Sequence, residues 1–111
     1  MSKLEKYISI IYKMVNTYTL EKSTRKNKKF VIIMDNNMSH HFGDDRYEDY
    51  TKHNDIERKK RYITRTIKQP QDNIHSPAFW SLNLLWNKPT LEQSIKNVEK
   101  KYNIKIINKI N

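Results

Sequence analysis

The sequence predicts an α+β protein, in which a three-stranded antiparallel meander is covered on one face by helices. Three observations lead to this fold class. The chain has 111 residues, which is the length of a single domain. Short runs rich in β-branched and aromatic residues lie between 17 and 43. Apolar residues then recur at three- and four-residue intervals over 54–102, as in amphipathic helices.

An N-terminal helix is predicted over residues 1–16. Ser2-Lys3-Leu4-Glu5 has the pattern of a capping box, in which the hydroxyl of Ser2 and the carboxylate of Glu5 each accept from the other residue's amide. Apolar residues follow at helical spacing up to position 15, and Asn16 can end the helix.

The meander is predicted from three apolar runs and the turns that separate them. The expected strands are 17–20, 30–34 and 38–42. Asp35-Asn36-Asn37 suits a tight hairpin, because asparagine tolerates positive φ better than other residues with a Cβ. Gly43 is the only glycine, and it marks a place where the backbone needs positive φ or a close approach.

The helical part spans 54–102 and contains three helices. Asn54 is the expected N-cap of the first, with Glu57 as its box partner, and Gln69-Pro70 ends it. The expected starts of the second and third helices are Ser76-Pro77 and Thr90, the latter paired with Gln93.

The segment 78–86 is the most apolar of the chain, and we expect it to form the core around Trp80. Asn103 can end the last helix. The alternation Ile104-Lys105-Ile106 predicts a short closing strand at 104–107.

Composition limits the classes of function. The chain carries a formal net charge of +10, which favours an anionic partner, with nucleic acid the first choice. It has no cysteine, which excludes disulfides, thiolate zinc sites and cysteine nucleophiles. No apolar run approaches the ~20 residues of a membrane span, and no signal peptide is recognisable, so we expect a soluble intracellular protein without membrane contact. Phosphate-loop, esterase and metalloprotease motifs are absent, and no cofactor is predicted.

The positive charge is concentrated in the second half of the chain. Residues 57–111 hold 12 basic and 4 acidic side chains, against 10 and 8 in residues 1–56. On the first helix of the helical part, Ile56, Ile63 and Ile67 share one face. The opposite face carries the basic residues Arg58, Arg61, Arg65 and Lys68. Like charges at this spacing repel one another, and a bound anion would relieve the repulsion. The guanidinium group of arginine can bind phosphate through two hydrogen bonds at once.

A second basic group lies in the loop between the first two strands and includes Arg25, Lys26 and Lys28. The two groups together predict binding to the phosphate backbone of DNA or RNA with little sequence preference, because phosphate contacts carry no base information. Two other interpretations of the basic helix stay open, namely contact with an acidic protein surface and a merely solvated face.

A metal-dependent nuclease is a further alternative. A β-hairpin followed by a helix is the outline of a ββα-metal nuclease, with His41 as the base and His53 or Asn54 near the metal. Adjacent histidines on a strand point to opposite faces, however, so only one of His40 and His41 can serve such a site. The sequence therefore predicts no metal site and no catalytic residue.

Two separated groups of motifs resemble a known family. They are His41-Phe42-Gly43 and Asp49-Tyr50-Thr51, followed by Phe79-Trp80-Ser81 and the run 84–91. They are similar to motifs of short basic proteins of unknown function encoded by giant DNA viruses of the mimivirus and chlorella-virus kind, over roughly residues 28–102. The chain departs from that pattern at 44–46, which lacks the usual glycine, and at Thr66, where histidine is usual.

The resemblance implies a viral protein that acts in the viral factory of the host-cell cytoplasm or is packaged in the virion. It supplies no catalytic residues. We therefore expect a non-enzymatic nucleic-acid-associated protein of a large DNA virus. The alternative is a small virion structural or cement protein that contacts acidic capsid protein.

Overall fold

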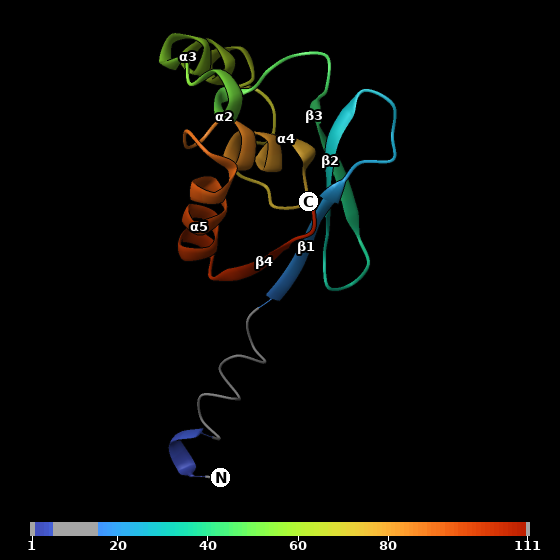
Figure 1. Ribbon diagram of the computed structural model, residues 1–111, viewed down its shortest axis with the longest axis vertical. Coiled ribbons are helices and arrows are strands. Elements are labelled where there is room, and N and C mark those ends of the chain that lie inside the picture. The colour runs from blue at the N-terminus through green and yellow to red at the C-terminus, as the bar shows by residue number, and fades with distance from the viewer. Residues whose placement is uncertain (1, 6–15, 111) are drawn as a thin grey trace.

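The computed structural model describes residues 2–5 and 16–110, which form a mixed sheet and several helices (Figure 1). The strands are β1 (Asn16–Lys22), β2 (Lys28–Ile33), β3 (Ser39–Asp44) and β4 (Ile104–Asn108). The helices are α2 (Tyr50–His53), α3 (Ile56–Arg65), α4 (Pro77–Trp80), the π-helical segment η1 (Ser81–Leu85) and α5 (Leu91–Tyr102). The α+β class predicted from the sequence is confirmed.

The sheet differs from the predicted three-stranded meander. Its order is β3-β2-β1-β4, with β1, β2 and β3 antiparallel and β4 parallel to β1. The strand predicted at 104–107 is confirmed, and it enlarges the sheet to four strands of mixed direction. A parallel neighbour needs a long connection back across the sheet, and here the helices between β3 and β4 provide it.

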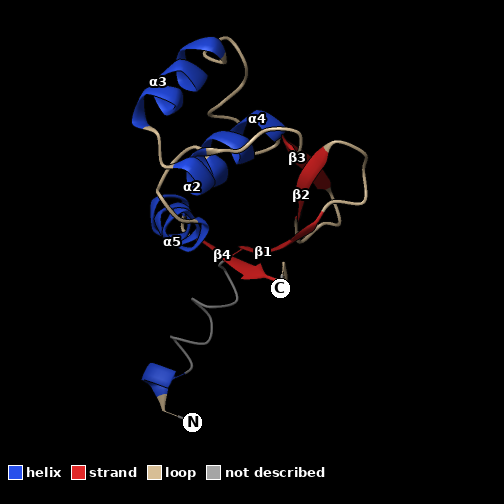
Figure 2. Ribbon diagram, turned by 45° about the horizontal axis from the view of Figure 1, so that its top comes forward, coloured by secondary structure: helices blue, strands red, loops and turns tan. Residues whose placement is uncertain are grey.

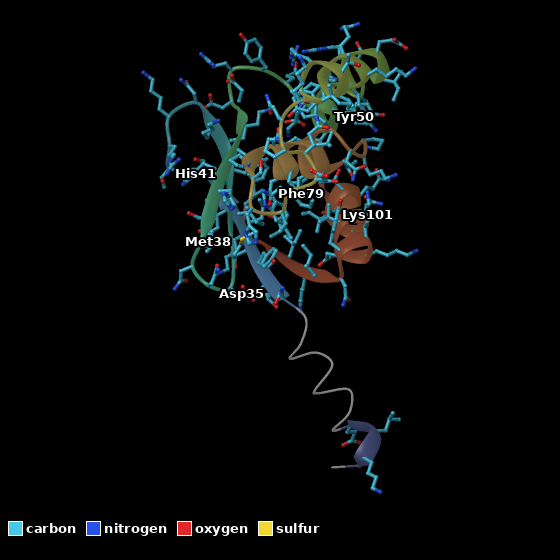
Figure 3. The ribbon with its side chains drawn as sticks, turned by 180° about the vertical axis from the view of Figure 1, so that it is seen from behind. Asp35, Met38, His41, Tyr50, Phe79 and Lys101 are labelled. Atoms are coloured by element: carbon cyan, nitrogen blue, oxygen red, sulfur yellow. The ribbon has the colours of Figure 1, made fainter. Side chains whose placement is uncertain are left out.

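The core lies between one face of the sheet and the segment α4–η1–α5. Phe79, Trp80 and Val98 are fully buried there against Leu20 and Phe42 of the sheet. Figure 3 shows Phe79 in the middle of the molecule, between the strands and α5. The prediction that 78–86 forms the core is confirmed for Phe79 and Trp80, whereas Trp86 is only partly buried. That 81–85 winds as a π-helix was not predicted.

Most of the predicted helix and turn signals are confirmed by the hydrogen bonds. The hydroxyls of Ser76 and Thr90 accept from the amides of Ala78 and Gln93, at 3.1 and 3.2 Å. Asn37, Gly43 and Asn103 all have positive φ, at 65°, 79° and 53°. A Cβ on Gly43 would lie 2.6 Å from the Cδ1 atom of Leu85, so glycine is needed there for space as well.

The N-terminal helix was predicted over 1–16, and its capping box is present. The amide of Glu5 donates to the Ser2 hydroxyl at 3.1 Å, and the amide of Ser2 donates to the Glu5 carboxylate at 3.4 Å. The prediction for 6–15 lies outside the described residues. The prediction that Asn16 ends the helix is wrong, because Asn16 is the first residue of β1 and pairs with Ile104 of β4.

The N-cap of α3 was predicted one residue too early. Asn54 adopts the left-handed conformation that ends α2, with φ 51°. The carboxylate of Asp55 caps α3 instead, accepting from the amides of Glu57 and Arg58 at 3.0 and 3.2 Å. The helix also ends earlier than predicted, at Arg65, so Lys68 lies in the turn that follows. Asparagine is common both at the N-cap of a helix and in the left-handed residue that ends one. Asn54 has the left-handed conformation, and an N-cap residue is extended, so Asn54 cannot be the N-cap of α3.

Helix α3 is not packed on the sheet as expected. Figure 2 shows it at one end of the molecule, beyond α2 and α4. It has no buried residue, and Ile56 and Ile67 are 47% and 65% exposed. The prediction that Ile56, Ile63 and Ile67 form the apolar side of the helix that packs on the protein is therefore wrong for Ile56 and Ile67. The reason is that only the middle of the helix contacts the rest of the protein.

Candidate functional site

A cavity of about 660 Å³ is lined by residues of α3 and of the ends of β2 and β3. One wall is α3, the opposite wall is formed by the ends of β2 and β3, and α4, η1 and Trp86 supply further lining. The loop before α2 contributes Tyr47, Glu48 and Asp49 to the rim. A concave space of this size that is lined by both polar and apolar groups is typical of a ligand site.

Four of the basic residues predicted to bind phosphate line this cavity. Arg58, Arg61 and Arg65 come from α3, and Lys28 comes from β2. Lys68, Arg25 and Lys26 are also described by the structure but are not part of the lining. The fold thus brings one member of the predicted loop cluster together with three members of the predicted helix cluster.

The face of α3 that meets the protein is polar and aromatic. Tyr62 stacks on Trp86 with ring centroids 4.3 Å apart and an interplanar angle of 4°, and its hydroxyl donates to Ser81 at 2.9 Å. The Lys59 ammonium donates to the carbonyl of Asn87 at 2.6 Å and lies over the ring of Tyr50, which Figure 3 places close to α3. Burial lowers the pKa of Lys59 and raises the pKa of Tyr62. Lys59 and Tyr62 therefore hold the helix against the protein. Of the three arginines that line the cavity, Arg65 also contacts Tyr62, with its guanidinium 5.8 Å from the ring centroid.

The acidic side chains of the cavity are largely neutralised by other cations. Asp49 is buried and pairs with the Lys29 ammonium at 2.5 Å. Asp44 accepts two hydrogen bonds from the Arg46 guanidinium, at 2.9 and 2.8 Å, and these hold its pKa at about 2. Glu48 is the remaining carboxylate of the lining, and it forms no ion pair with any residue of 2–5 or 16–110.

The four cavity cations have no such partners. Across the described part of the chain, ion pairs are formed by Lys29, Arg46 and Lys60, and by none of Lys28, Arg58, Arg61 or Arg65. Four unpaired cations face one unpaired carboxylate, so the cavity has an excess of positive charge. Such an arrangement attracts an anion, and guanidinium groups bind phosphate oxygens through two hydrogen bonds at once.

Within the loop cluster, Lys28 lines the cavity, whereas Arg25 and Lys26 do not. The positive charges of Arg25 and Lys28 both act on His41, whose pKa is lowered first by burial and then by these two cations. Lys29 belongs to the same basic run as Lys28, but its ion pair with Asp49 was not predicted, because such a pair follows no local motif. Asp49 and Tyr47 were not assigned to the site, and the alternation of acidic and aromatic residues at 44–50 was the available signal for them.

The histidines do not assemble a metal site among the described residues. No group of three or more histidine, aspartate or glutamate side chains comes close enough there to hold a metal ion. The Nδ1 atom of His53 accepts from the amide of Asp55 at 2.9 Å, and the Nδ1 atom of His41 lies 2.7 Å from the Ser23 hydroxyl. The side-chain amide of Asn54 donates hydrogen bonds to the backbone carbonyls of Tyr50 and Pro89. These residues serve local structure, and we do not propose the nuclease alternative.

Asp49 is expected to be the structural anchor of the cavity rim. It pairs with Lys29 and caps α2 by accepting from the amide of Thr51 at 2.9 Å. We predict that Asp49→Ala lowers the free energy of unfolding by about 2–3 kcal/mol. The loss should stay below that of a wholly orphaned buried charge, because the 15% exposed side chain of Lys29 can still reach water.

Chemical denaturation of three variants checks this role. Asp49→Asn keeps an oxygen for the cap but loses the charge, so its loss should be intermediate. Asp45→Ala is the matched control, since Asp45 is exposed and its side chain makes no hydrogen bond with the described residues. Equal midpoints for Asp49→Ala and Asp45→Ala would show that the pair does not stabilise the rim.

Comparison with known proteins gives one family and no function. Residues 18–66 match the model of a family of unknown function (DUF5754). The matched region is less than half of the chain; it runs from β1 to the end of α3 and includes all four cavity cations, but not α4, η1 or α5. No curated protein and no solved structure matches the chain. In the described residues no helix is both long and apolar enough to cross a membrane.

Proposed function

We propose that this protein binds nucleic acid through its phosphate backbone, using the cavity between α3 and the ends of β2 and β3. The observation that carries the proposal is the convergence of four unpaired cations, Arg58, Arg61, Arg65 and Lys28, on one concave surface. Three of them are arginines, which suit phosphate better than lysines do. Arg25, Lys26 and Lys68 do not line the cavity, but they add to the net positive charge that attracts the polyanion.

In this mode of binding the protein makes no hydrogen bonds to the base edges that carry the nucleic-acid sequence. The contacts are to phosphates, so sequence preference should be slight. The resemblance to proteins of giant DNA viruses supports a role in the viral factory or in the virion. Contact with an acidic capsid protein remains the second candidate, and the net positive cavity supports it as well.

A titration at several salt concentrations tests the proposal. The full chain is titrated into labelled DNA and RNA between about 50 and 200 mM salt, with poly-glutamate as the acidic protein mimic. Four phosphate contacts predict a slope of log K against log salt of about −3.6 on duplex DNA and about −2.8 on a single strand. Poly-glutamate should bind more weakly than either. A slope near zero on all nucleic acids, or tighter binding to poly-glutamate, would contradict the proposal.

A further inference from the structure

We infer that the ligand of the cavity is a single strand, with an unpaired nucleotide seated inside. This inference rests on the proposed function and names its substrate class. A surface that binds only the backbone of a duplex needs cations on a ridge or a flat face that follows the phosphates. Here Lys28 lies across a cavity from Arg58, Arg61 and Arg65, so a bound chain is contacted from two sides.

The size and the lining of the cavity support a nucleotide rather than a bare phosphate. A volume of about 660 Å³ lies well inside the range of sites for small organic ligands, which is roughly 300–1,000 Å³. Apolar groups of Pro77 and Ala78 line it together with the arginines, and the buried core residues Phe42 and Leu85 lie behind them. Phosphate gains nothing from apolar walls, whereas a base has two apolar faces and prefers such surroundings.

Tyr47 provides the stacking surface that a base requires. Its ring lines the cavity rim and is 65% exposed, with the Arg46 guanidinium 5.9 Å from its centroid. Among the other aromatic rings of the lining, Phe42 is buried, and Tyr62 and Trp86 are stacked on each other. Tyr47 is therefore the aromatic ring of the cavity that is best placed to accept a base. Stacking of this kind is tolerant of base identity, which agrees with backbone binding of low sequence preference.

The bases of a duplex are stacked inside the helix and cannot reach Tyr47. A duplex can therefore use only the cations at the cavity mouth, whereas a single strand can use the cations and the ring together. At equal salt we expect a single strand to bind about tenfold more tightly than a duplex of the same length and sequence.

The experiment compares four ligands on the full chain: a single strand, its duplex, the same strand with abasic sites, and a mononucleotide. The abasic strand keeps the phosphates and should lose about tenfold in affinity. Tyr47→Ala should lose about tenfold on the normal strand and nothing on the abasic strand, while Tyr47→Phe should bind like the parent. Met38→Ala is the matched control, because Met38 is exposed but does not line the cavity.

The outcomes separate the two proposals. If the duplex binds as tightly as the strand, or if the abasic strand binds as tightly as the normal one, the single-strand inference is overturned while backbone binding stands. If the mononucleotide binds as tightly as the strand, the cavity is a site for free nucleotides and the inference also fails. If the affinity for every nucleic acid is independent of salt concentration, the proposed function is wrong, and the inference that rests on it is wrong as well.

Discussion

Replacing Trp80 with alanine is expected to lower the free energy of unfolding by about 3–5 kcal/mol. The side chain is fully buried, its indole donates to the carbonyl of Ile74 at 2.9 Å, and its ring meets Tyr18 and Phe79 edge-on at 5.8 and 4.9 Å. Alanine leaves a cavity at the centre of the single core cluster and also removes this hydrogen bond. Because domains of this size have a net stability of only about 5–15 kcal/mol, a large part of it would be lost.

Denaturant unfolding followed by circular dichroism measures this loss. Tyr47→Ala is the control, since it removes an aromatic ring that is 65% exposed and should change the stability by no more than about 0.5 kcal/mol. If Trp80→Ala unfolded at the same denaturant concentration as Tyr47→Ala, Trp80 would not belong to the core.

Removing the four cavity cations is expected to abolish most of the binding to nucleic acid. The variant replaces Arg58, Arg61, Arg65 and Lys28 with glutamine. Each lost phosphate contact should reduce the salt slope by about 1, so that the slope on a single strand falls from about −2.8 to near zero. The parent should lose about fiftyfold in affinity between 50 and 200 mM salt, and the variant almost nothing.

Lysines far from the cavity provide a control with the same change of net charge. Lys96, Lys100, Lys105 and Lys109 are exposed on α5, β4 and the residues after it, and none lines the cavity. Replacing these four lysines with glutamine should leave most of the affinity for nucleic acid unchanged. The reason is that salt screens the attraction between exposed charges beyond about 10 Å. The control variant should unfold like the parent. The cavity variant should lose at most about 1 kcal/mol of stability, because α3 is still held through Lys59 and Tyr62 while the contact of Arg65 with the Tyr62 ring is removed. Equal losses in the two variants would show that binding depends on net charge and not on the cavity.

Features that depend on a few neighbouring residues were predictable. Thr90 with Gln93 and Ser76 with Pro77 marked the starts of helices, because a cap is a contact between a side chain and an amide two or three residues away. Asn103 and Gly43 marked positive φ for the same local reason. Asn54 shows the limit of such signals, since the same residue type suits an N-cap and a left-handed C-cap, and Asp55 was available next to it.

The faces of α3 could not be assigned from periodicity alone. The spacing of Ile56, Ile63 and Ile67 indicates a shared side of the helix, but it does not say how much protein lies opposite that side. In the structure only Tyr62 and its neighbours meet η1 and Trp86, and the two terminal isoleucines stay exposed. The basic residues of the same helix consequently line a cavity rather than an open solvent face.

The sequence by itself determined the α+β class, the apolar core around Trp80, the helix caps Ser76 and Thr90, and the presence of an unusually basic helix, because composition and short-range patterns carry these properties. Only the tertiary structure decided that β4 pairs with β1 from the other end of the chain, and that Lys28 joins Arg58, Arg61 and Arg65 while Lys68 does not. It also decided that Lys29 neutralises Asp49, which lies 20 residues further along the chain. The physical reason is that pairing and charge balance depend on distances between residues far apart in the chain, which no local pattern encodes.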